Sequence, residues 1–472
     1  MREYLIFSKF FLKHTSKNIY LFSIRGLYII KNFGNKKNFF LAISNLNFSL
    51  IIRKIFFSFK KFVFFLIRNL IFSKVKITKL KKKNILIVSH IVDSKISIKN
   101  DTYFFSFVNY LKKKKISFLR ILINQKSEIK DSSTINGKTV NSVIIFPSYL
   151  KFFDEIKIFF LRMFNAINLF FILLNYGHLK YFKFLFYSLF NSETTLSIKM
   201  YYYFKRILKV VKPRYFIFTY EGYPWENACL RSIKDSNLKT KCIGYQHSII
   251  TKDHLSIRNF FLGNQPDIIW FSDNLSLKLL KNELLKNNIN YLKVGNFKKK
   301  KKLKFSKVKK IDFLVLPEGD YSECQKLFSF TLNLAINFEK LSFIWRVHPV
   351  INFDRVLSNL NLEYKNIPQN IHFSKSSSLE LDCQKCKYVV YRTSNAVIDA
   401  INCKLIPIYL KLKKERLIMC PLGKSFKKKI ITSSFELLRF IKKKGEYYKK
   451  KNINIYFKSN LDLLSKKNNY FK

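Results

Sequence analysis

Short apolar runs recur along the chain from residue 84 onward, with helix-like segments between them. The run NILIVSH (84–90) precedes a segment of helical spacing at 101–115, and ISFLRILIN (116–124) is a second apolar run. Such a run is typical of a strand buried on both faces, as in a parallel sheet. Strands that alternate with helices therefore predict an α/β fold with parallel sheets.

The same alternation occurs in two parts of the chain, which a lysine-rich segment separates. In the first part, the expected strands lie at 84–90, 116–124, 214–220, 241–245, 267–272 and 291–297. In the second part, they open the segments 311–320, 341–349, 371–378, 387–395 and 405–410. Two similar α/β halves predict two Rossmann-like domains that face each other across a cleft, and 472 residues suffice for both cores.

This division predicts five parts of the chain. They are a basic helical extension at 1–80, a first Rossmann-like domain at 81–297 with a long helical section at 150–210, a lysine-rich linker at 298–310, a second Rossmann-like domain at 311–425, and a basic, partly helical tail at 426–472. The linker has no periodic apolar face, as expected of a solvated connection.

The chain is strongly basic, with a formal net charge of +59. Such a surface attracts anionic lipid headgroups, nucleotide phosphates and nucleic acid. Surfaces that read bases usually rely on arginine, whereas lysine supplies most of the basic residues here and is spread over the whole chain. We therefore expect no specific nucleic acid partner. A basic nucleic-acid-binding protein remains an alternative, because 17% of the residues are aromatic.

Residues 54–74 mix aromatic and aliphatic side chains with lysine and arginine. This composition suits a helix that lies on an anionic membrane surface, and it equally suits a buried helix with snorkelling lysines. No segment reaches the roughly 18 uncharged apolar residues of a spanning helix, and the N-terminus lacks the pattern of a signal peptide. Seven scattered cysteines suit a reducing compartment. We expect a cytoplasmic protein that is peripheral at the inner face of the membrane.

Polar residues follow the expected strands of the first part. Glu221 ends the strand at 214–220, and His247 follows the next strand. The other cleft candidates of this part are His90, Trp225, Glu226 and Gln246. Ligands of open parallel sheets bind beyond the carboxyl ends of the strands. Glu221 or His247 could act as a general base there, although Glu221 could instead cap the following helix, as Glu226 could.

The strands of the second part end in the same way. The candidates are Glu318, Arg346, His348, Arg392, Ser394 and Asn395. Arg346 and His348 are two residues apart, so both could face one side of an extended chain and bind a diphosphate or a ribose. Alternatively, the segment is a strand end stiffened by Pro349, with Arg346 in a salt bridge. The segment 392–395 opens an expected helix and could bind an anion or simply cap that helix. Glu318 could accept hydrogen bonds from sugar hydroxyls or belong to a turn.

Several motifs of cofactor binding are missing from the sequence. It contains no GxxxxGK[ST] loop and no GxGxxG, which argues against a P-loop ATPase and against ordinary nicotinamide binding. It contains no Asp-x-Asp pair to hold a divalent ion on a nucleotide-sugar. The CxxC at Cys383 and Cys386 has no second pair at zinc spacing. We therefore expect no metal and no cofactor, and chemistry that relies on fixed protein charges.

The motifs resemble those of two-domain GT-B glycosyltransferases, specifically surface-polysaccharide proteins of O-antigen or capsule biosynthesis. The resemblance covers residues 84–410 and is carried by Glu-Gly-x-x-Trp-Glu (221–226), Gly-Tyr-Gln-His (244–247), Pro-Glu-Gly (317–319), Arg-Val-His-Pro (346–349), Tyr-Arg-Thr-Ser (391–394) and Pro-Ile-Tyr (407–409). The His-Pro and Ser motifs also resemble those of bacterial sialyltransferases, which implies that His348 and Ser394 bind the nucleotide. Phe297 stands where the proline of a Val-Gly-Asn-Pro segment would end the first domain.

The resemblance implies a metal-independent glycosyltransferase with a nucleotide-sugar as donor substrate and a lipid-linked or glycan acceptor. The first domain would bind the acceptor, with Glu221 or His247 as the base. The second would bind the donor through Arg346, His348, Arg392 and Ser394. A non-catalytic protein that binds glycan or lipid carrier during polysaccharide export is a further alternative.

Overall fold

The computed structural model describes most of the chain between residues 80 and 442. The described residues are 80–91, 100–124, 142–146, 150, 152–175, 192–250, 257, 265–298, 311–349, 351–374, 378–412, 420–422 and 428–442, with Arg53, Phe56, Phe59, Lys60 and Val63. The predicted linker after Lys298, most of the predicted extension at 1–80 and the end of the predicted tail lie outside them.

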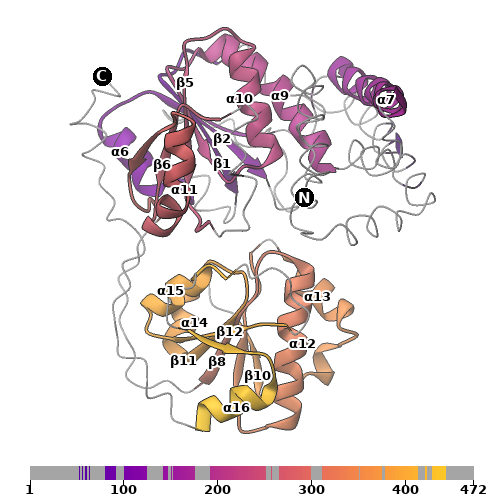
Figure 1. The fold of residues 1–472 in the computed structure, drawn as a ribbon, viewed down its shortest axis with the longest axis vertical. Helices are drawn as coiled ribbons and strands as arrows, with labels where there is room; N and C mark the ends of the chain where they lie inside the picture. Colours follow the sequence, from indigo (N-terminus) through magenta and orange to yellow (C-terminus); the bar gives the residue numbers. More distant parts are fainter. Residues whose placement is uncertain are drawn as a thin grey trace.

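The first domain contains a seven-stranded sheet in which every pairing is parallel (Figure 1). Its strands are β1 (Ile85–Ile91), β2 (Phe118–Asn124), β3 (Ser142–Ile145), β4 (Tyr215–Thr219), β5 (Lys241–Gln246), β6 (Ile268–Phe271) and β7 (Asn290–Lys293). Their order is β3-β2-β1-β4-β5-β6-β7. The order reverses between β1 and β4, which places a ligand-binding crevice at the carboxyl ends of these strands.

The second domain repeats this plan in a six-stranded parallel sheet. Its strands are β8 (Ile311–Leu316), β9 (Phe343–Trp345), β10 (Ile371–Phe373), β11 (Cys386–Tyr391), β12 (Ile406–Leu410) and β13 (Lys429–Ile431), in the order β10-β9-β8-β11-β12-β13. The strand order therefore reverses between β8 and β11. The predicted fold class, two Rossmann-like α/β domains, is confirmed.

Helices cover the sheets and explain why the central strands are apolar throughout. In the first domain they are α6 (Phe105–Lys113), α7 (Phe152–Asn175), α9 (Ser192–Val211), α10 (Pro224–Lys234) and α11 (Asn274–Lys286). In the second they are α12 (Tyr321–Asn337), α13 (Phe353–Asn359), α14 (Leu379–Lys385), α15 (Ala396–Asn402) and α16 (Ser434–Lys442), with a 3-10 turn at Tyr364–Asn366. Every residue of β1 is buried, because alternate side chains enter separate cores on the two faces of the sheet.

Some elements differ from the sequence predictions. The second sheet continues past residue 425, because β13 pairs with β12 and Leu437 of α16 is buried in the same core. The lysine-rich sequence around β13 hid this strand, and the short elements β3, α13 and α14 were not predicted either. The predicted helical section at 150–210 contains α7 and α9. None of the described helices combines the length and the apolar content that crossing a bilayer requires.

Candidate functional site

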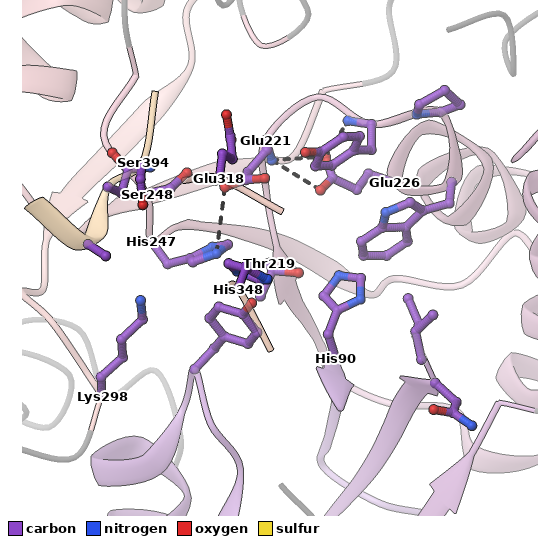
Figure 2. A pocket seen from close by; sticks show the side chains of 18 of the residues that line it. His90, Thr219, Glu221, Glu226, His247, Ser248, Lys298, Glu318, His348 and Ser394 are labelled. Carbon is purple, nitrogen blue, oxygen red and sulfur yellow. Dashed lines mark hydrogen bonds and ion pairs between the residues drawn. The ribbon is translucent and has the colours of Figure 1, made fainter. Parts of the chain in front are cut away.

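One cavity of about 660 Å³ is lined by both domains (Figure 2). The first domain contributes His90, Tyr103, Ile123, Asn124, Leu196, Ser197, Thr219, Glu221, Tyr223, Pro224, Trp225, Glu226, His247 and Ser248, and the second contributes Glu318, His348, Ser394, Asn395, Ala396 and Asp399. Lys298, at the start of the connection between the domains, also lines it. The cavity lies at the carboxyl ends of β1, β4, β5, β8 and β11, as the strand-end rule predicts for parallel sheets.

The lining residues of the first domain form the first wall of the cavity, and those of the second domain form the second wall. Glu221 and His247 are the central pair of the first wall. His247 Nε2 lies 3.6 Å from Glu221 Oε1, and the Ser248 hydroxyl donates a hydrogen bond to the same carboxylate oxygen. Glu221 follows β4 and His247 follows β5, and these strands are neighbours in the sheet. The parallel pairing therefore brings together two groups that are 26 positions apart in the chain.

The loop that carries Glu221 is held by the carboxylate of Glu226. This carboxylate accepts hydrogen bonds from the backbone N–H groups of Glu221 at 3.0 Å, Gly222 at 2.7 Å and Tyr223 at 2.9 Å. Gly222 has a φ of 80°, a conformation that favours glycine. Glu226 is fully buried, and burial raises its pKa well above the usual value. The capping role that was an alternative for Glu221 thus belongs to Glu226, which fixes the position of Glu221.

The two histidines of the first wall are held neutral at pH 7. Burial lowers the pKa of His247 to about 4, with Lys298 adding to the effect and Glu221 opposing it. Burial, followed by the charge of His247, lowers the pKa of His90 to about 4. The ring of Tyr103 meets His247 edge-on, with 4.3 Å between the ring centroids. His247 can therefore accept a proton while Glu221 stabilises the cation that results.

His90 packs against Trp225. Their rings meet edge-on at 5.3 Å, and both side chains are largely buried while still lining the cavity. Trp225 is the second residue of α10, so the strand-to-helix turn that presents Glu221 also brings this indole to β1. These two predicted candidates therefore form part of the packed wall beside the central pair.

The second wall carries smaller polar groups. Burial between the domains raises the pKa of Glu318 to about 7, although its side chain still reaches the solvent of the cavity. Burial and then the charge of Lys298 lower the pKa of His348 to about 4. Ser394 and Asn395 precede α15 and also line the cavity. The structure thus brings all four of these predicted residues to the same site as Glu221 and His247.

The two predicted arginines are engaged elsewhere. Arg346 donates to Asp382 at 2.6 Å and to Ser374 at 2.8 Å. The chain leaves β9 at Trp345, so Arg346 and His348 do not share one face of a strand as the sequence had suggested. Arg346 borders a separate aromatic pocket of the second domain, and it does not line the cavity between the domains. Its expected contact with donor phosphates has no support in this geometry.

Arg392 and Gln246 also lie outside the cavity lining. Arg392 is buried, with Nε donating to Glu323 at 2.7 Å and an Nη donating to the Leu410 carbonyl oxygen at 3.0 Å. Gln246 ends β5 and is fully buried, and its amide atoms have no hydrogen-bond partner among the described residues. Neither can be assigned to the site as the sequence had suggested.

The sequence analysis did not name several residues of the cavity lining. Among them are Tyr103, Ser248, Lys298 and Asp399. Ser248 follows His247 directly and could have been included on that ground, whereas Lys298 was counted with a solvated linker. Tyr103 precedes α6 and Asp399 lies within α15, so neither stands at a strand end. Lys298 is the only lysine or arginine among the described lining residues, and its Nζ lies 5.5 Å from the centre of the Tyr103 ring.

The described residues contain no group of three or more His, Cys, Asp or Glu side chains that could hold a metal ion. The cysteines among them are free and buried, including Cys383 and Cys386 of the CxxC. The polar groups of the cavity include the pair of Glu221 and His247, and one lysine.

No protein-family model and no curated protein matches this chain. The UDP-GlcNAc 2-epimerase of Neisseria meningitidis, bound to UDP-GlcNAc, is 12% identical over 81% of this chain and 97% of its own, with a TM-score of 0.48. The corresponding Methanocaldococcus jannaschii enzyme, in complex with UDP-GlcNAc and UDP, is 15% identical over 79% and 96%, with a TM-score of 0.47. The glycotransferase of kitacinnamycin is 7% identical over 75% and 87%, with a TM-score of 0.42. At these identities and TM-scores the likenesses assign neither family nor activity, and the two-domain fold rests on the sheet topology.

Proposed function

We propose that this protein is a glycosyltransferase that moves a sugar from a nucleotide-sugar to a lipid-linked surface glycan, such as O-antigen, lipopolysaccharide or capsule. One observation carries the proposal. A neutral histidine paired with a carboxylate, His247 with Glu221, faces the polar residues of a second Rossmann-like domain across one cavity. The cavity volume of about 660 Å³ lies within the roughly 300–1,000 Å³ of small-molecule sites.

The first wall would activate the acceptor. His247 would take the proton of an acceptor hydroxyl while Glu221 stabilises the imidazolium, or Glu221 would take the proton itself. The acceptor oxygen would then form a bond to the anomeric carbon of the donor sugar, and the bond from that carbon to the nucleotide phosphate would break. The proton remains on the base, and the electron pair leaves with the phosphate.

The second wall and Lys298 would bind the donor. The positive charge of Lys298 lowers the pKa values of both His247 and His348, so it acts on both walls of the cavity. A leaving phosphate placed there would be stabilised by a fixed cation without a metal ion. His348, Ser394 and Asn395 would hold the phosphates, and Glu318 would accept hydrogen bonds from ribose or sugar hydroxyls.

The first test is nucleotide binding, measured by thermal shift with UDP, GDP, CMP, CDP, dTDP and their common sugars, with and without Mg²⁺. We expect one nucleotide to stabilise the protein independently of Mg²⁺, with the shift reduced in Lys298→Ala. Lys293→Ala provides the matched control, because Lys293 is an exposed lysine at the end of β7. A folded protein that responds to no nucleotide would overturn the proposal.

A second candidate, epimerisation of a nucleotide-sugar, is favoured by Glu318. Its pKa of about 7 means that it exchanges a proton near neutral pH, and it lies in the domain opposite His247. Glu318 and His247 could remove a proton from a sugar carbon and return one to the other face. Incubating the protein with a nucleotide-sugar in D₂O and no acceptor separates the two reactions. Deuterium in a recovered, epimerised sugar supports epimerisation, whereas an absolute requirement for an acceptor supports transfer.

A lipid-linked acceptor would place the protein in the cytoplasm, peripheral at the inner face of the membrane. The net charge of +59 supports this location, because basic proteins are attracted to the anionic lipids of that face.

A further inference from the structure

The helix α7 directs its acidic residues toward the protein. Asp154 and Glu155 in its first turn are buried, and each pairs with a basic residue of α9. Glu155 lies 2.9 Å from Lys199, and Arg206 donates to Asp154. Ile158 and Ala166 of the same helix are buried in the core of the first domain. The inner side of α7 is thus fully anchored and supplies both apolar and ionic contacts.

The opposite side of α7 exposes large apolar side chains. They recur at spacings of three, four and seven residues, so they lie in one stripe along the helix. The members of this outer face are Phe153, Phe160, Phe164, Ile167, Phe171 and Leu174, with exposed fractions between 46% and 79%. A helix that faced water would carry polar residues there, and a contiguous apolar patch of this kind marks an interaction surface.

The charges around this outer face are positive. Lys157 is exposed between Phe153 and Phe160 on the same side of the helix, and no carboxylate of α7 is exposed. Phe59 contacts Phe159 of α7 at a ring distance of 6.2 Å. Near Phe59 in the chain, Phe56 and the cations Arg53 and Lys60 are also exposed.

We propose that the outer face of α7 docks onto a bilayer that contains anionic lipids. Apolar side chains would enter the boundary between headgroups and acyl chains, and the cations would contact the headgroups. No described helix can cross a membrane, so α7 would lie along the surface. A second copy of the chain fits less well, because each copy carries a net charge of +59 and the two faces would meet with like charges.

The same helix that anchors α7 also reaches the cavity. Leu196 and Ser197 of α9 line the cavity, while Lys199 and Arg206 of α9 hold α7. Figure 1 shows α7 at the outer edge of the first domain, beyond α9. Docking through α7 would therefore hold the wall proposed to bind the acceptor next to the membrane. The surface does not depend on the proposed reaction, because lipid binding needs no turnover.

The test is co-sedimentation of the full-length protein with phosphatidylcholine vesicles, with and without about 30% phosphatidylglycerol. The variant Phe160→Ser/Phe164→Ser removes two aromatic rings from the outer face. Phe435→Ser is the matched control, because Phe435 is 65% exposed on α16 of the second domain. We expect the double variant to bind anionic vesicles about tenfold or more weakly than the wild type, and the control to bind as the wild type does.

A charge variant separates the ionic contribution from the apolar one. Lys157→Glu should weaken binding to the anionic vesicles and leave any binding to pure phosphatidylcholine unchanged. Thermal unfolding and nucleotide binding are measured on the same samples, so a failure of lipid binding is distinguishable from a failure of the proposed reaction. The proposal would be overturned if the wild type did not bind anionic vesicles, or if the double variant bound them as strongly as the wild type. It would also be overturned if the wild type formed a dimer without binding lipid and the double variant were monomeric.

Discussion

The two walls of the cavity differ in how firmly they hold their polar groups. In the first wall, aromatic rings pack against both histidines, and the buried carboxylate of Glu226 fixes the loop of Glu221. In the second wall, the described lining residues are small or polar, and Glu318 reaches solvent. Reactive groups need fixed geometry, whereas a binding surface tolerates adjustment. The difference supports a catalytic first wall and a binding second wall.

The arginines add to this comparison. Arg346 and Arg392 lie close to the second wall in sequence, yet both are engaged in ion pairs within their own domain. The second domain uses these guanidinium groups for its own stability and leaves Lys298, outside both sheets, as the cation of the cavity.

The largest expected effect is on turnover. Glu221→Gln should lower kcat by about 10²–10⁴-fold, because it removes either the base or the partner of the protonated base. The affinity for nucleotide should change little, since the donor would bind to the other wall. Steady-state kinetics and thermal shift measure the two quantities, with Glu283→Gln on α11 as a control away from the cavity. If Glu221→Gln weakened nucleotide binding as much as turnover, the division between the walls would be wrong.

The next effect is on the stability of the second domain. Arg346→Ala should cost about 3–5 kcal/mol of unfolding free energy, because it leaves the buried carboxylate of Asp382 without its cation. Denaturant unfolding, with hydrogen exchange used to monitor the second domain, measures this loss. Lys365→Ala, which breaks an exposed pair with Glu363, should have no measurable effect. A variant of Arg346 that folds normally but loses nucleotide affinity would restore this arginine to the site.

Protonation of its two buried histidines should destabilise the first domain as the pH falls. His90 and His247 have pKa values lowered to about 4, so the stability they contribute is present above pH 6.5 and lost as the pH falls toward 4. At pH 5 the loss is about 2 kcal/mol for each histidine. In the second domain His348 behaves in the same way. The raised pKa of Glu318 works in the opposite direction, because its contribution is present below pH 4.5 and lost as the pH rises through about 7. The raised pKa of the buried Glu226 has the same sign in the first domain.

Hydrogen exchange at pH 7 and pH 5, corrected for the intrinsic exchange rates, compares the two domains directly. The variant His90→Gln/His247→Gln should reduce the pH dependence of the first domain and leave that of the second unchanged. An unchanged pH dependence of the first domain in this variant would contradict the prediction.

The smallest expected effect is on donor affinity. His348→Ala should raise the Kd of the preferred nucleotide by about tenfold, the loss of one hydrogen bond to a charged group, with kcat at saturation within about twofold. His372→Ala is the control, because His372 is exposed on β10. Isothermal titration and kinetics at saturating donor check both numbers. A fall in kcat with an unchanged Kd would place His348 in the catalytic machinery.

The sequence by itself determined the strands and the edge of each sheet at which the site lies. Apolar runs such as ILIVSHI and IDFLVL can only be buried on both faces, so the fold class and the positions of Glu221, His247 and Glu318 follow from local pattern. The same pattern could not reveal β13, because a strand of three residues at the end of a lysine run makes a weak signal that pairing with β12 overrides.

Only the tertiary structure decided the partners of the charged groups. Arg346 pairs with Asp382, 36 residues away, and Arg392 with Glu323, 69 residues away, so neither contact can be read from neighbouring residues. The orientation of α7, with its acidic side toward α9 and its apolar side exposed, could not be predicted from the sequence either. Its composition equally fits a buried helix. Local periodicity determines which secondary structure a segment forms. Whether a charge can be buried depends instead on which distant group the fold brings within reach of it.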